Sequence, residues 1–451
     1  MIPLSTNFAK FNALKDKRCV HLLEIAGYSR VFTSQTTNIP GQQPWIQEIS
    51  GGGLDADCMN GSASRSELTV RVLDKDGTIS RDLQSIIFEG AVATLKTGFR
   101  ELPQSDFATV VVMKMDKVEV AERGTIYDFV LRDLGVELNN VIYRTGDDGY
   151  PTSQDHKRTV VGNPMDILVD ILENEIGYPA GWLNATVIAA YKTNLFPGLT
   201  MEFSLDKPPQ ADEFLKTELF KPFFGFGFWD YLGRYTPHFH AAQAAPVIAL
   251  ALTANNIQSP LPVEMAGDYY NVVSYRLDYD GSNFNSGIDS LYAPGVNIYG
   301  LPAQDIIQAK GLRSPLGGAL YARLVAWTLF QRYGLRPGIL QPDADWEGIK
   351  LEPGDLVTVT HAQIKNKLSG AESMAAEMFE VYGVAPDWQR GTVSLSLLDV
   401  NYLAQGPYLI APDGTPAWTS ASPTEKATYM FIADDATKQY SDGTPGHPLF
   451  P

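Results

Sequence analysis

The sequence predicts an α+β protein that is predominantly β. We expect two related small β-barrel domains, an inserted α+β domain, a helix packed on the second barrel and an extended C-terminal tail. Two stretches that combine turn residues with alternating strand residues, at 90–133 and at 351–400, predict the barrels. Segments between these stretches carry helix-capping residues and a helical apolar period, so they predict the helical parts.

The stretch at 351–400 predicts a three-stranded antiparallel meander. Residues 351–360 hold a Pro-Gly turn followed by β-rich residues, and two further alternating runs fill 378–384 and 391–400. Alternating runs that are separated by turn residues are typical of such a meander. The segment therefore predicts a small β-barrel or sheet.

A similar arrangement occurs near the start of the chain. Gly90 aligns with Gly354, and a Gly-Thr pair begins the last run in both copies, at Gly124 and Gly391. The matched runs are 90–95 with 354–359, 110–115 with 378–384, and 124–133 with 391–399. We interpret the match as an internal duplication of one β-unit. Two unrelated meanders that share a Gly-Thr turn are the alternative.

The first barrel domain is expected to span residues 1–145. Residues 19–25 and 28–33 form two strand-like runs, and residues 68–72 alternate so that their apolar side chains lie on one face. Asp76 and Gly77 give the turn signal that follows.

The α+β domain is expected at residues 146–242. Asn163 is the predicted N-cap of a helix, Pro164 its first residue and Gly177 its stop. Its predicted apolar face consists of Met165, Leu168, Val169, Leu172 and Ile176. A second helix is predicted at 209–219, and the aromatic segment 223–235 predicts a hairpin that turns at residues 230–233.

The second barrel domain is expected at residues 243–400 and the extended tail at 401–451. Strands are predicted at 247–253 and 271–279, and a helix at 317–333. The helix has one row of Leu320, Leu324, Trp327 and Gln331 and another of Ala319, Ala322, Ala326 and Phe330. The tail is rich in Pro, Gly and Ser and has little periodicity, so no core of its own is expected.

Composition limits the function further. The chain has 451 residues, which is more than one core usually supports, and a net charge of −17. Proteins that grip nucleic acid neutralise phosphates with Lys and Arg, so this acidic chain is not expected to bind DNA specifically. An acidic wall would still let DNA slide past without sticking.

The cysteines and the apolar tracts indicate synthesis in a cytoplasm. Cys19 and Cys58 are too few for a disulfide framework, and residues 1–18 contain no apolar run of a secretory signal. The longest apolar tract, at 247–252, is too short to span a bilayer.

Two patterns near the aromatic hairpin resemble binding sites. His238 and His240 would lie on one face of a strand, but no acidic or cysteine partner follows at ligand spacing, so we expect no metal there. Gly225 and Gly227 resemble a phosphate loop, but Asp230 occupies the third glycine position, so a structural hairpin is expected.

Several carboxylates were weighed in the same way. Asp278, Asp280 and Ser282 resemble the start of a calcium loop, but Asn283 replaces its glycine and Asp289 its closing Glu. The pairs Asp55 with Asp57 and Asp343 with Asp345 could serve a glycosidase, although both lie in loops where solvated acids are common. We therefore predict no catalytic residue, no cofactor and no metal, and a protein that is not an enzyme.

Taken together, parts of the sequence resemble the tail hub proteins of bacteriophages and gene transfer agents. The resemblance covers about residues 19–400. It is carried by the strands at 22–33 and 68–74, the helix start at 162–172, and the segment 351–360 with the alanine-rich helix before it and the strands at 379–381 and 391–393 after it.

The resemblance implies a structural virion protein at the tail tip or baseplate. Such hubs are homotrimers in which each subunit contributes two related barrels, so six barrels form a ring. A ring of this kind joins a hexameric tail tube to a threefold fibre or spike, closes the tail channel and lets DNA pass at genome ejection. Assembly would take place in the cytoplasm of the bacterial host.

The chain departs from some relatives, and two other functions stay open. Some tail-tip relatives bind an iron–sulfur cluster, which Cys19 and Cys58 cannot hold. A hexameric distal tail adaptor would share the β-rich domains and the location but need not contain the duplicated barrel. A module that binds or hydrolyses cell-wall glycan could lie in the aromatic segment 223–235.

Overall fold

The computed structural model describes most of the chain up to residue 400. The described residues are 2–12, 19–37, 39, 41–122, 125–147, 158–240, 247–259, 263–265, 269–291, 304–334, 336–366 and 371–400, with 409–410, 420, 422 and 429–430. The predicted tail at 401–451 lies outside them, apart from the last-named short pieces, which include β26 (Leu409–Ile410) and β27 (Tyr429–Met430). None of the helices within these ranges is long and apolar enough to cross a membrane.

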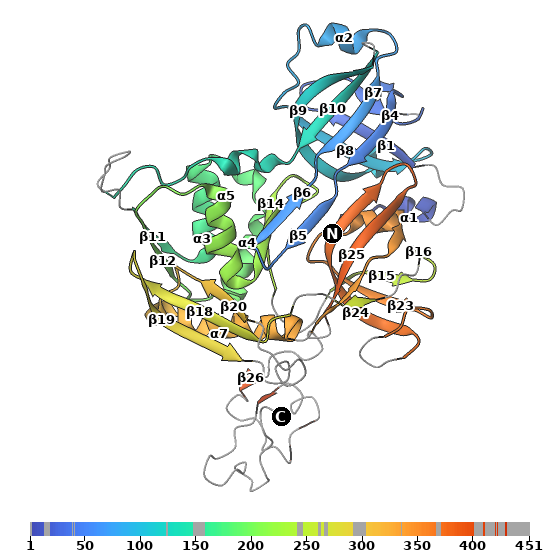
Figure 1. Ribbon diagram of the computed structural model, residues 1–451. Coiled ribbons are helices and arrows are strands. Elements are labelled where there is room, and N and C mark those ends of the chain that lie inside the picture. Colours follow the sequence, from blue (N-terminus) through green and yellow to red (C-terminus); the bar gives the residue numbers. More distant parts are fainter. Residues whose placement is uncertain are drawn as a thin grey trace, which may run out of the picture.

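The protein is predominantly β, as predicted, and its strands form several sheets (Figure 1). The first large sheet has the order β3-β2-β1-β8-β9-β10-β7-β4. Its strands are β1 (Cys19–Ile25), β2 (Val31–Thr33), β3 (Gln42–Gln43), β4 (Ile46–Gly51), β7 (Leu68–Leu73), β8 (Val92–Phe99), β9 (Ala108–Glu122) and β10 (Ile126–Arg132). Leu68, Val70 and Val72 are fully buried, which confirms the predicted alternation of β7.

The second large sheet combines C-terminal strands with one hairpin from the N-terminal part of the chain. Its main path is β15-β23-β24-β25-β21-β17, and β22 also pairs with β25. Its strands are β15 (Ile248–Thr253), β16 (Ile257–Ser259), β17 (Glu264–Met265), β21 (Gly338–Leu340), β22 (Asp343–Asp345), β23 (Leu356–His361), β24 (Met374–Asp387) and β25 (Thr392–Asp399), with the hairpin β5 (Leu54–Asp57) and β6 (Ser62–Arg65). Asp55 of β5 pairs with Gly383 of β24, so this hairpin crosses from the first sheet to the second.

Neither sheet closes into a barrel within the described residues, which corrects the prediction of two small barrels. The first strand path ends at β3 and β4, and the second at β15 and β17. β3 and β17 have two residues each, so neither can carry a hydrogen-bonded ladder around to the opposite edge. The two large sheets are therefore both open.

The two meanders share their strand order and their hydrogen bonds. Gly90 and Gly354 both have a left-handed φ, of 81° and 91°. Each glycine N–H donates to the middle strand at 2.8 Å, from Gly90 to Met115 and from Gly354 to Val381. The N–H of that partner in turn donates to the carbonyl of the residue that follows the glycine. The predicted alignment of Gly90 with Gly354 agrees with this register.

The match extends beyond the meanders, with two differences. The first sheet contains the path β1-β8-β9-β10-β7-β4, and the second contains the path β15-β23-β24-β25-β22-β16. When the strands of each path are ranked by their order in the chain, both paths run through the ranks in the same sequence. However, β1 is antiparallel to β8, whereas β15 is parallel to β23. The register also aligns Met115 with Val381. The segment of the second copy that matches the run at 110–115 therefore starts two residues before the predicted start at residue 378.

A buried hydrogen-bonded chain joins the two sheets within one hydrophobic core. The Nε2 atom of His21 lies 3.1 Å from the carbonyl oxygen of Trp388, and its Nδ1 atom lies 3.2 Å from Thr97 Oγ1. The indole N–H of Trp346 donates to the same hydroxyl at 3.1 Å. The tautomer with its proton on Nε2 satisfies all of these groups, because Thr97 can then donate to Nδ1 and accept from Trp346.

The remaining elements form a second core. They are β11 (Arg158–Gly162), β12 (Met201–Leu205), β13 (Gly225–Trp229), β14 (Tyr235–Phe239), β18 (Val272–Tyr279), β19 (Phe284–Leu291), β20 (Gln304–Gln308), α3 (Pro164–Val169), η3 (Asp170–Glu175), α4 (Ala185–Asn194), α5 (Ala211–Phe214), η5 (Leu215–Phe220), η6 (Lys221–Phe223) and α7 (Gly318–Tyr333). Short helices elsewhere are α1 (Thr6–Asn12), α2 (Thr78–Asp82), η1 (Gln104–Asp106), η2 (Leu134–Asn139), η4 (Ala180–Trp182), η7 (Ser314–Leu316) and η8 (Trp346–Lys350).

The predicted helix after Asn163 is confirmed. The Asn163 side chain accepts the N–H of Met165 at 3.0 Å, Pro164 begins α3, and Gly177 has a left-handed φ of 86° after the helix. The second turns, η3, are wound as a π-helix, so Ile171 is fully buried where the predicted 3.6-residue period had not placed it. The helix predicted at 209–219 is also present, as α5 and η5.

The helix predicted at 317–333 is present as α7, but its position differs from the prediction. We expected it to pack on the second barrel, which was predicted to include the strand at 271–279. The helix does contact that strand, β18, together with β19 and η6, but these elements belong to the second core and not to the second large sheet. The alanine row is buried at Ala322 and Ala326, while Leu320 and Leu324 are 59% and 51% exposed. Small side chains let the helix approach the sheet closely, so the alanine row faces inward.

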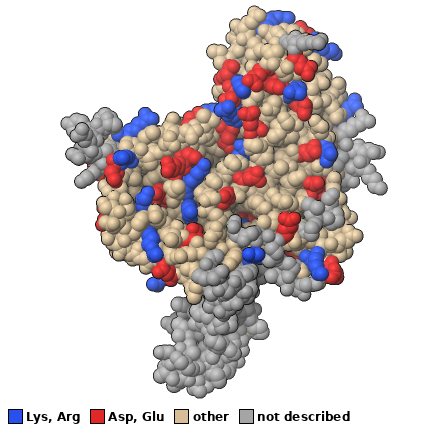
Figure 2. All heavy atoms as spheres, viewed as in Figure 1, with Lys and Arg blue, Asp and Glu red and all other residues tan. Residues whose placement is uncertain are grey.

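The charged side chains are interspersed on the face seen in Figure 2. Acidic and basic groups alternate there over both large sheets and over the second core, and no continuous basic stripe crosses the described part of that face.

The matched glycines predict unequal effects of the same substitution. An added Cβ at Gly90 has no atom within 4 Å, whereas at Gly354 it would lie 2.5 Å from ring atoms of His238. We expect Gly90→Ala to cost about 1–2 kcal/mol of unfolding free energy, from the left-handed φ alone. Gly354→Ala should cost roughly 2–4 kcal/mol, because overpacking adds to the strain. Urea unfolding of both variants checks this, and equal losses would contradict the stated contact.

His21 predicts a loss of stability in mild acid. Burial lowers the pKa of His21 to about 4, against a partial opposing effect of its bond to Trp388. The unfolded state therefore binds more protons below pH 6.5, and stability falls as the pH decreases from 6.5 towards 4. Between pH 7 and pH 5 this residue should contribute a loss of about 2 kcal/mol. His21→Gln cannot titrate and should flatten the pH dependence by that amount in urea unfolding at both pH values.

Candidate functional site

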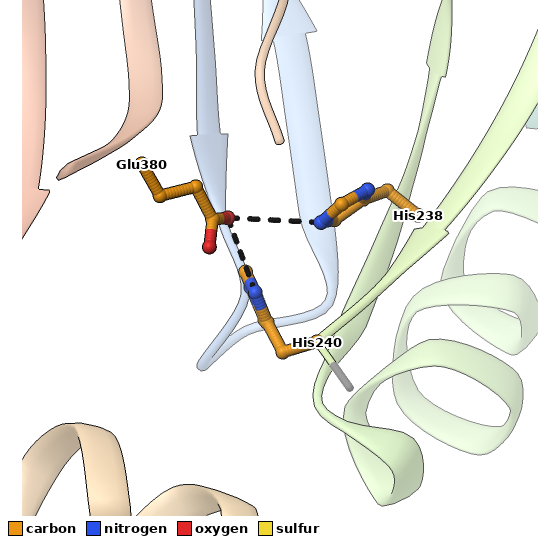
Figure 3. Close-up of side chains that lie close together, drawn as sticks. All are labelled: His238, His240 and Glu380. Atoms are coloured by element: carbon orange, nitrogen blue, oxygen red, sulfur yellow. Dashed lines mark ion pairs between the residues drawn. The ribbon is translucent and has the colours of Figure 1, made fainter. Parts of the chain in front are cut away.

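Four ionisable side chains meet where the second core contacts the second sheet. His238 lies in β14, His240 directly follows that strand, Glu380 lies in β24, and Arg332 lies in the last turn of α7. Figure 3 shows both imidazoles pointing toward the Glu380 carboxylate. We call these residues the His–Glu–Arg cluster.

The hairpin that carries the histidines is fixed by its turn. The Asp230 carboxylate accepts the backbone N–H groups of Leu232 and Arg234 at 2.9 Å and pairs with the Arg234 side chain at 2.8 Å. These bonds confirm the predicted turn at 230–233. Because side chains alternate along an extended chain, His238 in β14 and His240 directly after it point to the same side.

Gly225 and Gly227 allow close packing of the same hairpin. A Cβ at Gly225 would lie 2.4 Å from the Phe239 ring, and one at Gly227 would overlap the Tyr235 hydroxyl. Both glycines lie in β13, which is paired with β14, so the expected structural hairpin is confirmed and a phosphate loop is not formed.

Glu380 is the centre of the cluster. Its Oε1 atom lies 3.1 Å from His240 Nδ1 and 3.6 Å from His238 Nε2. Its Oε2 atom lies 2.7 Å from Arg332 Nη1, and that nitrogen is also 2.5 Å from His240 Nδ1. One carboxylate thus contacts both imidazoles and the guanidinium.

The electrostatics of the cluster fix its charge state near neutral pH. Burial alone would raise the pKa of Glu380, but Arg332 and then the two histidines outweigh it and hold that pKa well below its usual value. Burial, together with the positive charge of Arg332, lowers the pKa of His240 to about 3. At pH 7 the cluster therefore holds an ionised Glu380, a charged Arg332 and a neutral His240.

A cavity of about 240 Å³ adjoins the cluster. Its lining includes Cys58, Phe226, His240, Arg332, Tyr333 and Glu380. The Cys58 thiol lies 3.6 Å from the Tyr333 hydroxyl, and burial raises the pKa of Cys58 to about 11. The thiol is therefore protonated at neutral pH and is a poor nucleophile.

The other carboxylates weighed in the sequence hold turns and loops. Asp57 accepts two backbone N–H groups of the β5–β6 turn, and Asp280 does the same in the β18–β19 turn. Asp278 binds the backbone and hydroxyl of Ser314, so its oxygens face that loop. The calcium-loop pattern thus falls in a hairpin in which both carboxylates accept protein donors.

The remaining pairs are also bound to neighbouring groups. Asp343 accepts the Ser394 hydroxyl at 2.5 Å, and Asp345 caps η8. Asp55 lies in β5 beside β24, and burial raises its pKa. The absence of a catalytic residue remains a prediction.

Sequence reasoning missed the acidic partner of the histidines. Glu380 follows His240 by 140 residues, so no local spacing links them. A usable signal was present, because Glu380 interrupts an apolar strand and Arg332 an apolar helix. Buried charges of this kind need a partner, and the fold supplies one from each element.

Comparisons with known proteins give partial structural likenesses. No family model and no curated protein sequence matches this chain. The solved structures include the 43 kDa tail protein of prophage MuSo2 from Shewanella oneidensis, with 11% identity, a TM-score of 0.47 and coverage of 85% of this chain and 99% of that one.

Two further solved structures are similar to the same degree. A tail protein from Neisseria meningitidis has 11% identity, a TM-score of 0.49 and coverage of 85% and 98%. A prophage tail protein from Listeria monocytogenes has 8% identity, a TM-score of 0.46 and coverage of 84% and 94%. Since each TM-score is below 0.5, the function is inferred below from the residues of this chain.

The buried Arg332–Glu380 pair predicts a strong coupling in stability. Glu380→Gln leaves a buried guanidinium without its counter-charge, and Arg332→Met leaves a buried carboxylate, so each should cost roughly 3–5 kcal/mol of unfolding free energy. The double variant Arg332→Met with Glu380→Leu removes both charges and should recover most of that loss.

Urea unfolding of the two single variants and the double variant measures the coupling. Glu372→Gln removes one partner of an exposed pair with Lys365 and serves as the control, with little expected change. Additive losses in the double variant would show that the two groups do not depend on each other.

Proposed function

We propose that this chain is a structural protein of a phage-type tail, and that it acts as the hub of the tail tip or baseplate. Three copies would form a ring in which each chain contributes its two β-units. The ring would join a hexameric tail tube to a threefold fibre or spike, close the channel, and let DNA pass at ejection. The chain would reach this place in the virion after assembly in the host cytoplasm.

The observation that carries the proposal is the equivalence of the two β-units. Both place strands of the same chain order side by side, and both start the meander at a left-handed glycine with the same pair of hydrogen bonds. Two similar units in one chain let three chains present six similar surfaces. A trimer could then dock under a sixfold tube.

The differences between the two β-units support the part of the proposal in which one side of the ring binds a threefold partner. The hairpin β5–β6 adds to β24 of the second unit, while the first unit ends in β2 and β3. The edge strands also differ, since β1 runs antiparallel to its neighbour and β15 parallel. Surfaces built from these parts repeat three times in a trimer and would suit a threefold partner.

The rigid union of the β-units suits a ring component. The His21 chain of hydrogen bonds and the shared core hold the two sheets in one relative orientation. A fixed orientation is required if neighbouring subunits are to meet at a constant angle and close the ring. The acidic balance of the chain would let DNA move through the channel without adhering to it.

The copy number in assembled tail tips tests the proposal. Native mass spectrometry of tail tips released from virions should give three copies of this chain, because two β-units per chain satisfy a sixfold tube. An electron cryomicroscopy map should place residues near Val92 and near Leu356 at alternating positions around one ring. Six copies per tip would instead support a distal tail adaptor, and either β-unit lying outside the ring would refute the hub assignment.

A further inference from the structure

The arrangement around His238 is not explained by the Arg332–Glu380 ion pair. That pair accounts for one carboxylate oxygen and one guanidinium nitrogen, at 2.7 Å. His238 Nε2 is buried and has no hydrogen-bond partner within the described residues, yet it lies 3.6 Å from the other carboxylate oxygen. The ion pair does not explain why this imidazole nitrogen is enclosed beside a carboxylate.

His240 presents a related difficulty. Its Nδ1 atom lies 3.1 Å from Glu380 Oε1 and 2.5 Å from Arg332 Nη1. Nδ1 would have to donate a proton to the carboxylate but accept one from the guanidinium, and a single nitrogen cannot do both. Both difficulties disappear if the two imidazoles and Oε1 share a cation.

We propose that His238 Nε2, His240 Nδ1 and Glu380 Oε1 bind a divalent transition-metal ion of the zinc class. The three ligand atoms lie within 4.8 Å of one another. Bonds of about 2.0–2.2 Å in a tetrahedral site put ligand atoms roughly 3.3–3.6 Å apart. The separations of the two imidazole nitrogens from Oε1, 3.1 and 3.6 Å, are close to this spacing.

The surroundings of the three ligands suit such an ion. Two nitrogen ligands and one carboxylate favour zinc-like ions over calcium or magnesium, which prefer oxygen ligands. The adjoining cavity of about 240 Å³ gives a fourth ligand, such as water, access to the ion. The Phe226 ring packs at a tilt against the rings of His238 and His240 and restricts their orientations.

Arg332 takes a second role in this site. Its bond to Oε2 holds the carboxylate so that Oε1 faces the histidines, as outer partners do in metal sites. Its short approach to His240 Nδ1 occupies the side from which an ion would bind. The ion and this contact therefore exclude each other, and Arg332 must shift away from Nδ1 while it keeps Oε2.

The ion would connect the two cores of the protein. β14 belongs to the second core and β24 to the sheet that shares the first core. Ligands from both strands make the ion a cross-link between them. A ligand that binds only the folded state stabilises that state, so the ion should raise the melting temperature of the protein.

Metal binding by the full-length chain tests the site directly. The chain is stripped with a chelator and then titrated with Co²⁺, whose visible absorption reports tetrahedral coordination, and with Zn²⁺ in equilibrium dialysis. We expect one equivalent of metal per chain, a tetrahedral Co²⁺ spectrum, and a higher melting temperature with Zn²⁺.

His238→Ala is the decisive variant. It removes a ligand but no hydrogen bond of the cluster, so the protein should fold, and its metal affinity should fall at least about 100-fold. Its melting temperature should no longer respond to Zn²⁺. His361→Ala removes a histidine of β23 outside the cluster and should leave metal binding unchanged.

Two results would overturn the proposal. One is a wild-type chain that retains no more metal than His238→Ala, and the other is metal retention that His361→Ala abolishes as well. Both readouts use the isolated chain, so they do not depend on ring assembly. A chain that binds the ion but forms no trimeric ring would leave the metal site standing and remove the hub.

Discussion

The union of two β-units in one hydrophobic core is the constraint on which the rest of the structure depends. Each unit is an open sheet with one apolar face, and an open sheet must bury that face against another element. Here the partner is the other unit, so the aromatic side chains of Trp346 and Trp388 pack around His21 at the junction. The polar groups trapped there are satisfied by a single tautomer of His21, which specifies one relative orientation of the two sheets.

The hairpin β5–β6 shows how the two units became interdependent. It lies in the chain between strands of the first sheet, yet it pairs with β24 of the second. The second unit is therefore incomplete without residues from the N-terminal part of the chain. This pairing makes independent motion of the two units costly. Such motion would break the hydrogen bonds between β5 and β24 and would expose apolar surface. The hub proposed above would benefit from that rigidity.

Local signals in the sequence were enough for many elements but not for their partners. Asn163, Pro164 and Gly177 marked the helix ends correctly, and Gly90 with Gly354 marked the start of each meander, because caps and left-handed glycines act within a few residues. The sheet on which α7 packs was predicted incorrectly, because an apolar helix can pack on any apolar sheet and the sequence does not show which one. Barrel closure depends on the length of edge strands such as β17, which alternation does not report. Glu380 could not be assigned to His240 since their contact depends on the packing of two cores.

The two junctions between β-rich parts are built on different physics. At His21 every group is neutral, so the junction gains from burial and loses little to desolvation. At Glu380 an ionised pair is buried, and its desolvation offsets much of the Coulomb attraction, so hydrophobic replacements would hold the cores together at least as well. Stability alone therefore does not account for the His–Glu–Arg cluster. A neutral junction suffices to join two sheets, whereas two imidazoles and a carboxylate converging on one point are what a bound cation requires.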